Sequence, residues 1–171
     1  MKGKINIGFC NEKIFNNFFL NNSKLLVNYI FYKCGNIDLA NDIAQEAFLK
    51  FWSNCEKIFP DKAKAYLFTI ANNLFLNDIS RNKVVLKFKN TLPKNYTNES
   101  PEFLLEEKEF NSKLQNAISN LTEDQRTAFL MNRIDGKKYT EIAEILGITV
   151  KAVEKRIHNA LISLRKEIKN I

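Results

Sequence analysis

The sequence predicts an all-α protein made of two small helical domains joined by a flexible basic linker. Only five Gly and three Pro occur in 171 residues, apolar residues recur at helical spacing, and no alternating β pattern is present. A hydrophobic fraction of 45% is sufficient for a buried core and argues against global disorder. We assign residues 1–83 to the first domain, 84–99 to the linker and 100–171 to the second domain.

The first domain is expected to hold four helices around a core rich in Phe. Helical periodicity starts near Glu12, and the polar stretch Asn21–Ser23 predicts a break, after which a second helix runs to Gly35. A third helix starts at about Asp38. Asp61, which follows a Phe-Pro break, is the expected N-cap of a fourth helix. These four helices would close one bundle.

The helix from about Asp38 divides into an apolar face and a polar face. The apolar face should be core and comprises Ala40, Ile43, Ala44, Ala47, Phe48 and Phe51. The opposite face comprises Asp42, Gln45, Glu46 and Leu49. An exposed Leu framed by carboxylates suits a partner surface with a basic rim. The alternative is a solvated face with one isolated Leu, since single exposed apolar residues are normal.

The second domain is expected to begin at Ser100, where a cap residue is followed by Pro and an acid. A capping box predicts another helix start at Thr122. The chain then forms a short helix over residues 140–146, a tight turn at Gly147 and a longer helix over residues 150–168. This spacing is typical of a helix-turn-helix.

The last helix also has two faces. Its core stripe is Val153, Ile157, Ala160, Leu161, Leu164 and Ile168. The outward side and its flanks carry Lys151, Ala152, Lys155, Arg156, His158 and Asn159. Side chains of this kind reach base edges and phosphates in a major groove. The alternative is an ordinary bundle helix with a solvated basic face.

Composition limits the chemistry that the chain can perform. A formal net charge of +7 and a pI near 9.3 favour a polyanionic partner. Cys10, Cys34 and Cys55 are widely spaced and His158 is the only histidine, which argues against a structural zinc site or a disulfide framework and favours a reducing compartment. No P-loop and no nucleophile–His–acid set is visible, so we expect no catalytic site, no metal, no cofactor and no small-molecule substrate. The absence of a signal peptide or a long apolar stretch predicts a cytoplasmic protein.

Three sets of residues, in this order along the chain, match the motifs of one family. The first set is Asp42, Gln45, Glu46, Phe48 and Lys50. The second is Leu67, Ile70, Ala71, Asn72, Asn73, Asp78 and Arg81. The third is Leu121, Arg126, Gly136, Tyr139, Glu141, Ile142, Ala143, Leu146, Gly147, Val153 and Arg156. Together they resemble the bacterial RNA polymerase sigma factors of the extracytoplasmic-function type, because the first set resembles the polymerase-docking motif, the second the −10-reading segment and the third the −35-reading domain.

The resemblance implies an initiation factor that binds core RNA polymerase and promoter DNA. Asp42, Gln45, Glu46 and Leu49 would dock on polymerase. The residues that would hold the −10 strand, including one base extruded into a pocket near the Phe59–Lys64 loop, are Lys64, Asn72, Asn73, Asn77 and Arg81. The outward side of the last helix would read the −35 duplex. An anti-sigma factor, commonly membrane-anchored in this family, would be a further partner.

Two other classes of function remain as alternatives. A stand-alone helix-turn-helix regulator would bind DNA but never polymerase, and it leaves the Leu49 face without a role. An enzyme that modifies RNA or DNA would need an acid–base or metal set, which the sequence does not display. Co-purification with core polymerase would distinguish a sigma factor from the stand-alone regulator, and a turnover assay would distinguish it from the enzyme.

Overall fold

The computed structural model describes residues 8–81 and 101–168, with side chains described for residues 8–79 and 110–168. Every regular element in these ranges is a helix, which confirms the all-α prediction. The elements are α1 (Glu12–Cys34), α2 (Ile37–Ser53), η1 (Cys55–Lys57), η2 (Pro60–Lys62), α3 (Ala63–Arg81), α4 (Pro101–Asn120), α5 (Glu123–Arg133), α6 (Tyr139–Leu146) and α7 (Val150–Glu167). None of these helices is both long enough and apolar enough to cross a membrane.

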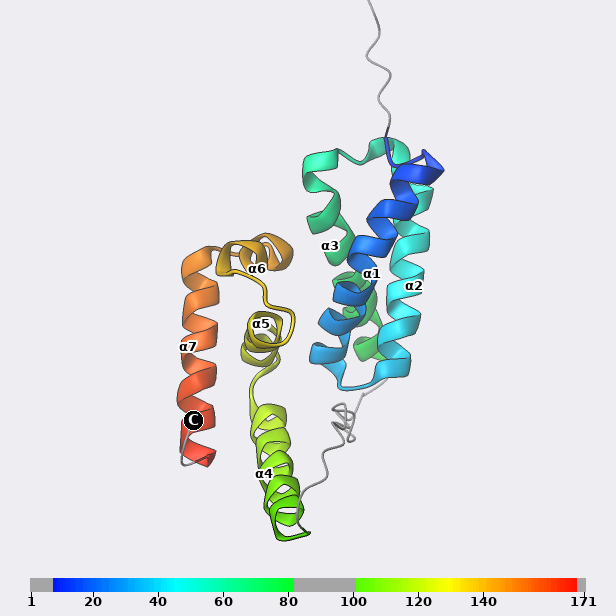
Figure 1. The fold of residues 1–171 in the computed structure, drawn as a ribbon. Coiled ribbons are helices and arrows are strands. Elements are labelled where there is room, and N and C mark those ends of the chain that lie inside the picture. Colours follow the sequence, from blue (N-terminus) through cyan, green and yellow to red (C-terminus); the bar gives the residue numbers. More distant parts are fainter. Residues whose placement is uncertain (1–7, 82–100, 169–171) are drawn as a thin grey trace, which may run out of the picture.

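Helices α1, α2 and α3 form a bundle with an aromatic core (Figure 1). Phe18 of α1 stacks on Phe51 of α2 with ring centroids 4.9 Å apart, and Tyr29 meets Phe68 of α3 edge-on at 5.2 Å. The two faces predicted for α2 are confirmed: the six apolar residues are all buried, and the four outward residues are all exposed. This agreement follows from helical periodicity alone.

Two predicted helix boundaries in this half are wrong. The chain does not break at Asn21–Ser23, because α1 is one continuous helix in which the buried Asn22 amide donates to the carbonyl of Phe18 at 2.8 Å. That intrahelical bond satisfies the polar side chain within the helix, so no break is needed. Asp61 is not an N-cap either, since it lies inside η2 and α3 begins at Ala63. The predicted end at Gly35 is confirmed by its φ of 66°.

Cysteine usage also differs from the expectation. Cys10 and Cys55 form a disulfide, with Cα atoms 5.1 Å apart although they are 45 residues apart in the sequence. The prediction that no disulfide links the cysteines is therefore wrong for this pair. Cys34 is free and buried. The sequence spacing could not reveal the pair, because tertiary packing brings the turn before α1 next to the end of α2.

The second half contains the predicted helix-turn-helix. Gly147 ends α6 with a φ of 65°, and the Thr149 hydroxyl accepts a hydrogen bond from the backbone N–H of Ala152 at 3.2 Å to cap α7. The capping box of α5 is also confirmed, with Thr122 and Gln125 bonded reciprocally. The inward side of α7 buries Val153 and Ile157, as predicted.

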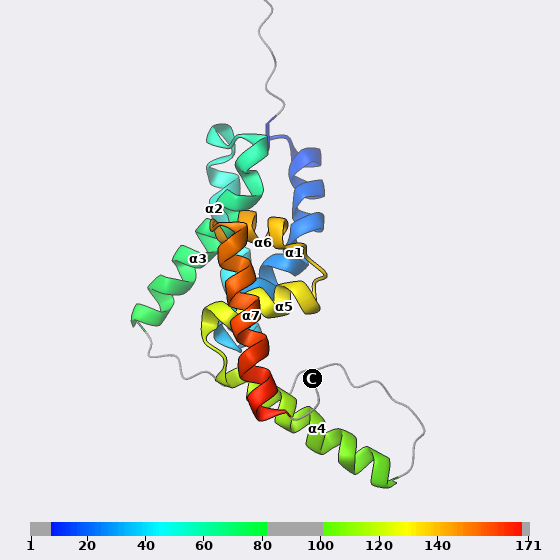
Figure 2. The same cartoon turned by 90° about the vertical axis from the view of Figure 1, so that its left-hand side faces the viewer.

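The two halves pack against each other. Helix α5 lies against α1, and α6 lies against α3, so that α5 sits between α7 and the first bundle (Figure 1). In the view of Figure 2, α7 lies in front of the other helices. One buried apolar cluster runs across the junction, from Leu26 and Ile30 of α1 to Met131 of α5 and Ile142 of α6. Burial of a continuous core is the main stabilising term for such a junction.

Candidate nucleic-acid and polymerase interfaces

The outward face of α2 is a wider apolar surface than the sequence predicted. Leu49 is 70% exposed, and Glu46 beside it pairs with Lys50 at 2.9 Å on the surface. A groove between α1 and α2 continues from this face. Its lining residues are Glu12, Phe15, Phe19, Gln45, Phe48, Leu49 and Trp52. Sequence reasoning missed the aromatic residues because their neighbours come from two helices.

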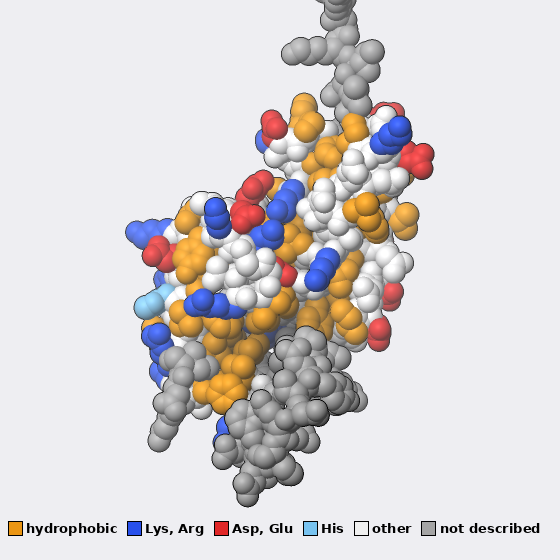
Figure 3. Space-filling model, in the orientation of Figure 1, with side chains coloured by type: hydrophobic (Ala, Val, Ile, Leu, Met, Phe, Trp, Pro, Cys, Tyr) orange, Lys and Arg blue, Asp and Glu red, His pale blue; other side chains and the backbone are white. Residues whose placement is uncertain are grey.

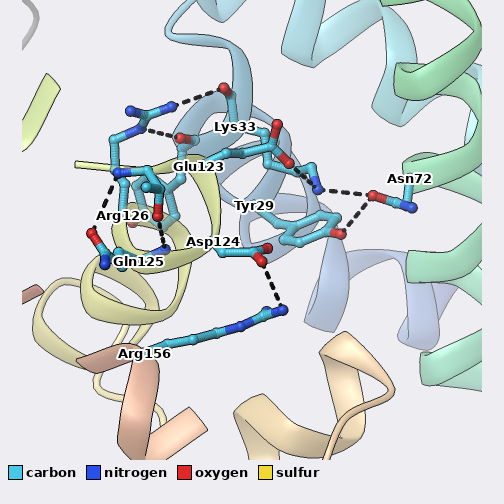
Figure 4. Close-up of polar contacts among 10 residues, drawn as sticks. Tyr29, Lys33, Asn72, Glu123, Asp124, Gln125, Arg126 and Arg156 are labelled. Carbon is cyan, nitrogen blue, oxygen red and sulfur yellow. Dashed lines mark hydrogen bonds and ion pairs between the residues drawn. The ribbon is translucent and has the colours of Figure 1, made fainter. Parts of the chain in front are cut away.

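On α3 the predicted Asn residues do not share one face. Asn73 and Asn77 are exposed, whereas Asn72 is half-buried and faces α1. Its side-chain oxygen accepts hydrogen bonds from the Tyr29 hydroxyl at 3.2 Å and from the Lys33 ammonium at 2.9 Å (Figure 4). Asn72 therefore does not share the exposed surface of Asn73, since consecutive residues of a helix are about 100° apart. The side chain of Arg81 lies outside the described residues.

Lys64 lies at the start of α3, the helix that packs against α6. It is half-buried, and its charge acts on Glu141 of α6. The pKa of Glu141 is lowered chiefly by the hydrogen bond that its carboxylate accepts from the backbone N–H of Lys138, at 2.8 Å, with a smaller contribution from Lys64. Lys64 is thus partly shielded from solvent in this closed arrangement.

The predicted −35 residues lie on the part of α7 that faces away from the first bundle. Lys151, Lys155 and His158 are exposed, while Ala152 and Asn159 are partly exposed. Lys and Arg side chains gather along this outer edge of the molecule (Figure 3).

Arg156 departs from that set. Its guanidinium pairs with the Asp124 carboxylate of α5 at 2.8 Å (Figure 4). Its side chain is only 27% exposed. The sequence placed Arg156 on a flank of the outward side, and the structure pairs it with α5.

Arg126 of α5 joins the two halves. Its side chain is 1% exposed, and it donates to the carbonyls of Tyr32 at 2.7 Å and Lys33 at 3.2 Å, in the last turn of α1. It also donates to two carbonyls of its own half, those of Ser119 and Leu121. The last carbonyls of a helix lack partners within the helix, and a cation there interacts favourably with the helix dipole. Arg126 thus caps α1 from the other half of the chain.

Two further contacts connect the halves through side chains. Lys33 is paired with Glu123 of α5 at 2.6 Å while it also bonds Asn72 of α3, so it connects three helices. The Asn28 amide donates to the Asp135 carboxylate at 2.6 Å. Burial is the main cause that raises the pKa of Asp135, and this hydrogen bond opposes the rise.

The sequence contained no signal for these junction contacts. Arg126 appears in the family motif, but its acceptors on α1 are 93 and 94 residues away and are backbone atoms. Among the residues with described side chains, no group of His, Cys, Asp or Glu could hold a metal ion.

Comparisons with known proteins agree with this geometry. A family model described as Sigma-70 region 2 matches residues 18–84, and one described as Sigma-70, region 4 matches residues 111–164. The ECF RNA polymerase sigma factor SigW of Bacillus subtilis is 31% identical over 148 residues, which cover 80% of this chain and 79% of SigW. The chain belongs to the ECF RNA polymerase sigma factors. Members of this family are initiation factors and not enzymes.

Other relatives and a solved structure extend the comparison. The ferric citrate uptake sigma factor FecI of Escherichia coli is 30% identical over 125 residues, which cover 71% of this chain and 72% of FecI. The chain spans about half of the sigma factor SigE of Mycolicibacterium smegmatis, 52% of its length, at 29% identity. The sigma factor RpoE of Bartonella quintana, solved with the anti-sigma factor NepR, shares the fold with a TM-score of 0.67 at 22% identity, covering 92% of this chain and 98% of RpoE.

Proposed function

We propose that this sigma factor binds core RNA polymerase through α2 and directs initiation by reading the −35 duplex with α7 and holding the melted −10 strand near α3. The observation that carries the proposal is one chain with both an exposed apolar face framed by carboxylates and a helix-turn-helix with an exposed basic side. A stand-alone regulator needs only the second feature. The chain itself would perform no catalysis.

Docking on polymerase would use Leu49 and the groove beside it. Complete burial of a Leu side chain stabilises a complex by about 1.5–3 kcal/mol. Trp52 and Phe19, which are 37% and 39% exposed, would add apolar area from the same groove. Asp42 and Glu46 would meet a basic rim on the partner, which favours correct orientation and fast association.

Capture of the −10 strand would use the exposed side of α3 and the loop before it. Asn73 and Asn77 present amides that can donate to and accept from base edges. Phe59, which is 72% exposed, offers an aromatic surface on which an extruded base can stack. Asn72 could join the site only after its hydrogen bonds with Tyr29 and Lys33 of α1 are released. Lys64, at the start of the same helix, is half-buried.

Recognition of the −35 element would use Lys151, Lys155 and His158, the exposed residues near the start of α7, together with Ala152 and Asn159. Arg156 would reach DNA only after it leaves Asp124.

Simultaneous reading of both elements requires the halves to separate. The −35 and −10 positions are about 25 base pairs apart, or about 85 Å along B-DNA at 3.4 Å per pair. A compact chain of this size has a radius of gyration of only about 16 Å. The proposed linker, residues 84–99, could extend to about 55 Å. We therefore divide the chain into domains at 1–83 and 100–171 that bind promoter DNA in an open form.

An anti-sigma factor, often membrane-anchored in this family, is proposed as a further partner. The support is the fold shared with RpoE of Bartonella quintana, a sigma factor solved with its anti-sigma factor NepR. We place the protein in the cytoplasm, where polymerase and the chromosome are found. Pull-down of this chain from its own cells would recover such a partner. Repeating the pull-down with added core polymerase would show whether the partner and polymerase compete for this chain.

Run-off transcription with core polymerase on a genomic fragment library tests the proposed function. We expect discrete transcripts that require this chain. Loss of those transcripts in Leu49→Ala, with retained binding to the promoter duplex, would assign α2 to polymerase docking. Duplex binding without any transcript or polymerase binding would favour the stand-alone regulator.

A further inference from the structure

The pair Cys10 and Cys55 occupies an informative position in the fold. Cys10 lies in the turn that leads into α1, and Cys55 is the first residue of η1, two residues after the end of α2. Residues 55–62 connect α2 to α3 and carry the exposed Phe59. The disulfide thus ties the beginning of this loop to the beginning of α1.

Packing and hydrogen bonds beside Cys10 anchor the turn before α1 to the bundle independently of the disulfide. Phe9, next to Cys10, is 7% exposed and meets Phe18 and Phe51 edge-on at 5.0 and 5.3 Å. Asn11, on the other side, caps α1 by accepting hydrogen bonds from two backbone N–H groups of its first turn. The reduced chain would therefore keep both thiols adjacent, and an intramolecular disulfide would form with little loss of entropy.

The pair is also accessible, in contrast to the third cysteine. Cys10 is exposed and Cys55 is partly exposed, so small thiols and disulfides can reach them. Cys34 is 1% exposed, and burial raises the pKa of its thiol, which makes it unreactive. The chain therefore contains one reactive pair and one internal control.

We propose that Cys10 and Cys55 form a reversible thiol–disulfide switch that restrains the loop of residues 55–62. One thiolate of the pair attacks a small disulfide, forms a mixed disulfide with it and releases one small thiol. The second thiolate then attacks the mixed disulfide, which forms the Cys10–Cys55 bond and releases the other small thiol. The pair loses two protons and two electrons in forming its S–S bond, and the small disulfide is reduced to two thiols. A loop tethered at its first residue adjusts more slowly around an extruded base. This effect on −10 capture rests on the proposed function.

Thiol titration tests the chemical part. The full chain is incubated in defined mixtures of reduced and oxidised glutathione, quenched, alkylated and analysed by mass spectrometry. Cys10 and Cys55 should lose their free thiols together as one intramolecular bond, while Cys34 stays free. Hydrogen exchange of residues 55–62 should be several-fold slower in the oxidised chain, and its Tm should rise by at least about 4 °C. Two separate glutathione adducts, or free thiols throughout the series, would overturn the proposal.

Promoter opening tests the regulatory part. With core polymerase and a promoter selected by run-off transcription, the oxidised chain should form open complexes several-fold more slowly than the reduced chain, and a reductant should restore the rate. The variant carrying Cys10→Ser and Cys55→Ser should form open complexes at the same rate with and without oxidant. Circular dichroism checks that this variant is folded. Equal rates for the two forms of the unmodified chain would overturn regulation. If neither form yields a transcript in the run-off screen, the proposed function is refuted, while the thiol titration would still decide the switch.

Discussion

Replacement of Asn28 by Ala should open the junction between the halves. The Asn28 amide donates to the Asp135 carboxylate at 2.6 Å, and a hydrogen bond to a charged group contributes about 1.5–3 kcal/mol. Without that donor, Asp135 stays in a site where burial already disfavours its charge. In the open form water solvates the carboxylate, so the open fraction should rise about 10- to 150-fold.

Cys34 provides the assay for this opening. Its free thiol lies in a cavity at the junction, which it lines together with Phe75 of α3 and Leu121 and Arg126 of the second half. In the chain with the Cys10–Cys55 disulfide, Cys34 is the only free thiol, and its rate of reaction with a thiol reagent measures the open fraction. The Asn28→Ala variant should react about 10- to 150-fold faster.

The matched control is Asn17→Ala, the same change at an exposed position of the same helix. It should leave the labelling rate of Cys34 unchanged. In the double variant, the combined effect of Asn28→Ala and Asp135→Ala on the free energy of opening should be smaller than the sum of the two single effects, because residues in direct contact are coupled. An unchanged rate in Asn28→Ala, or a change of equal size in the control, would refute the view that this hydrogen bond holds the halves together.

Four other outcomes are expected. Glu46→Ala and Leu49→Ala should each weaken binding to core polymerase without lowering Tm. If both variants bind core polymerase in a titration as tightly as the unmodified chain, the docking face is refuted. Lys155→Ala should weaken binding to all duplexes and reduce the slope of log K against log salt by about one; an unchanged slope would remove Lys155 from the DNA interface. Asn73→Ala should slow promoter opening, seen by permanganate footprinting, and a pre-melted template should reduce the defect; normal melting on linear DNA would move the pocket elsewhere. Because burial raises the pKa of Asp135, the closed form should become more stable as pH falls through that pKa, and the size measured by scattering should decrease. Asp135→Asn should abolish this pH dependence; if the variant keeps it, another group is responsible.

Local features of the fold were predictable because short-range rules determine them. The faces of α2, the capping box at Thr122 and the left-handed Gly147 follow from periodicity and backbone preference. The continuity of α1 was not predictable, since its Asn21–Ser23 stretch has the composition of a turn. The hydrogen bond from the Asn22 side chain, together with packing of apolar residues before and after this stretch, outweighs that local preference.

The candidate site was predictable only where it faces solvent. The exposed face around Leu49 and the exposed lysines of α7 lie where helical spacing placed them. Lys64, Asn72 and Arg156 were expected to contact DNA, but Asn72 and Arg156 are bonded to neighbouring helices and Lys64 is half-buried. Their partners lie on other helices of the packed chain, so no local pattern distinguishes them from solvated polar residues.

The way in which Arg126 binds α1 has an evolutionary consequence. Its acceptors on α1 are main-chain carbonyls, so residues 32 and 33 can mutate freely without loss of those two bonds, while position 126 must stay arginine. Asn28 and Asp135 instead meet through side chains, so a change at one favours a compensating change at the other. Descendants that keep the closed form should therefore show an invariant position 126 without covarying partners, beside a covarying pair at 28 and 135.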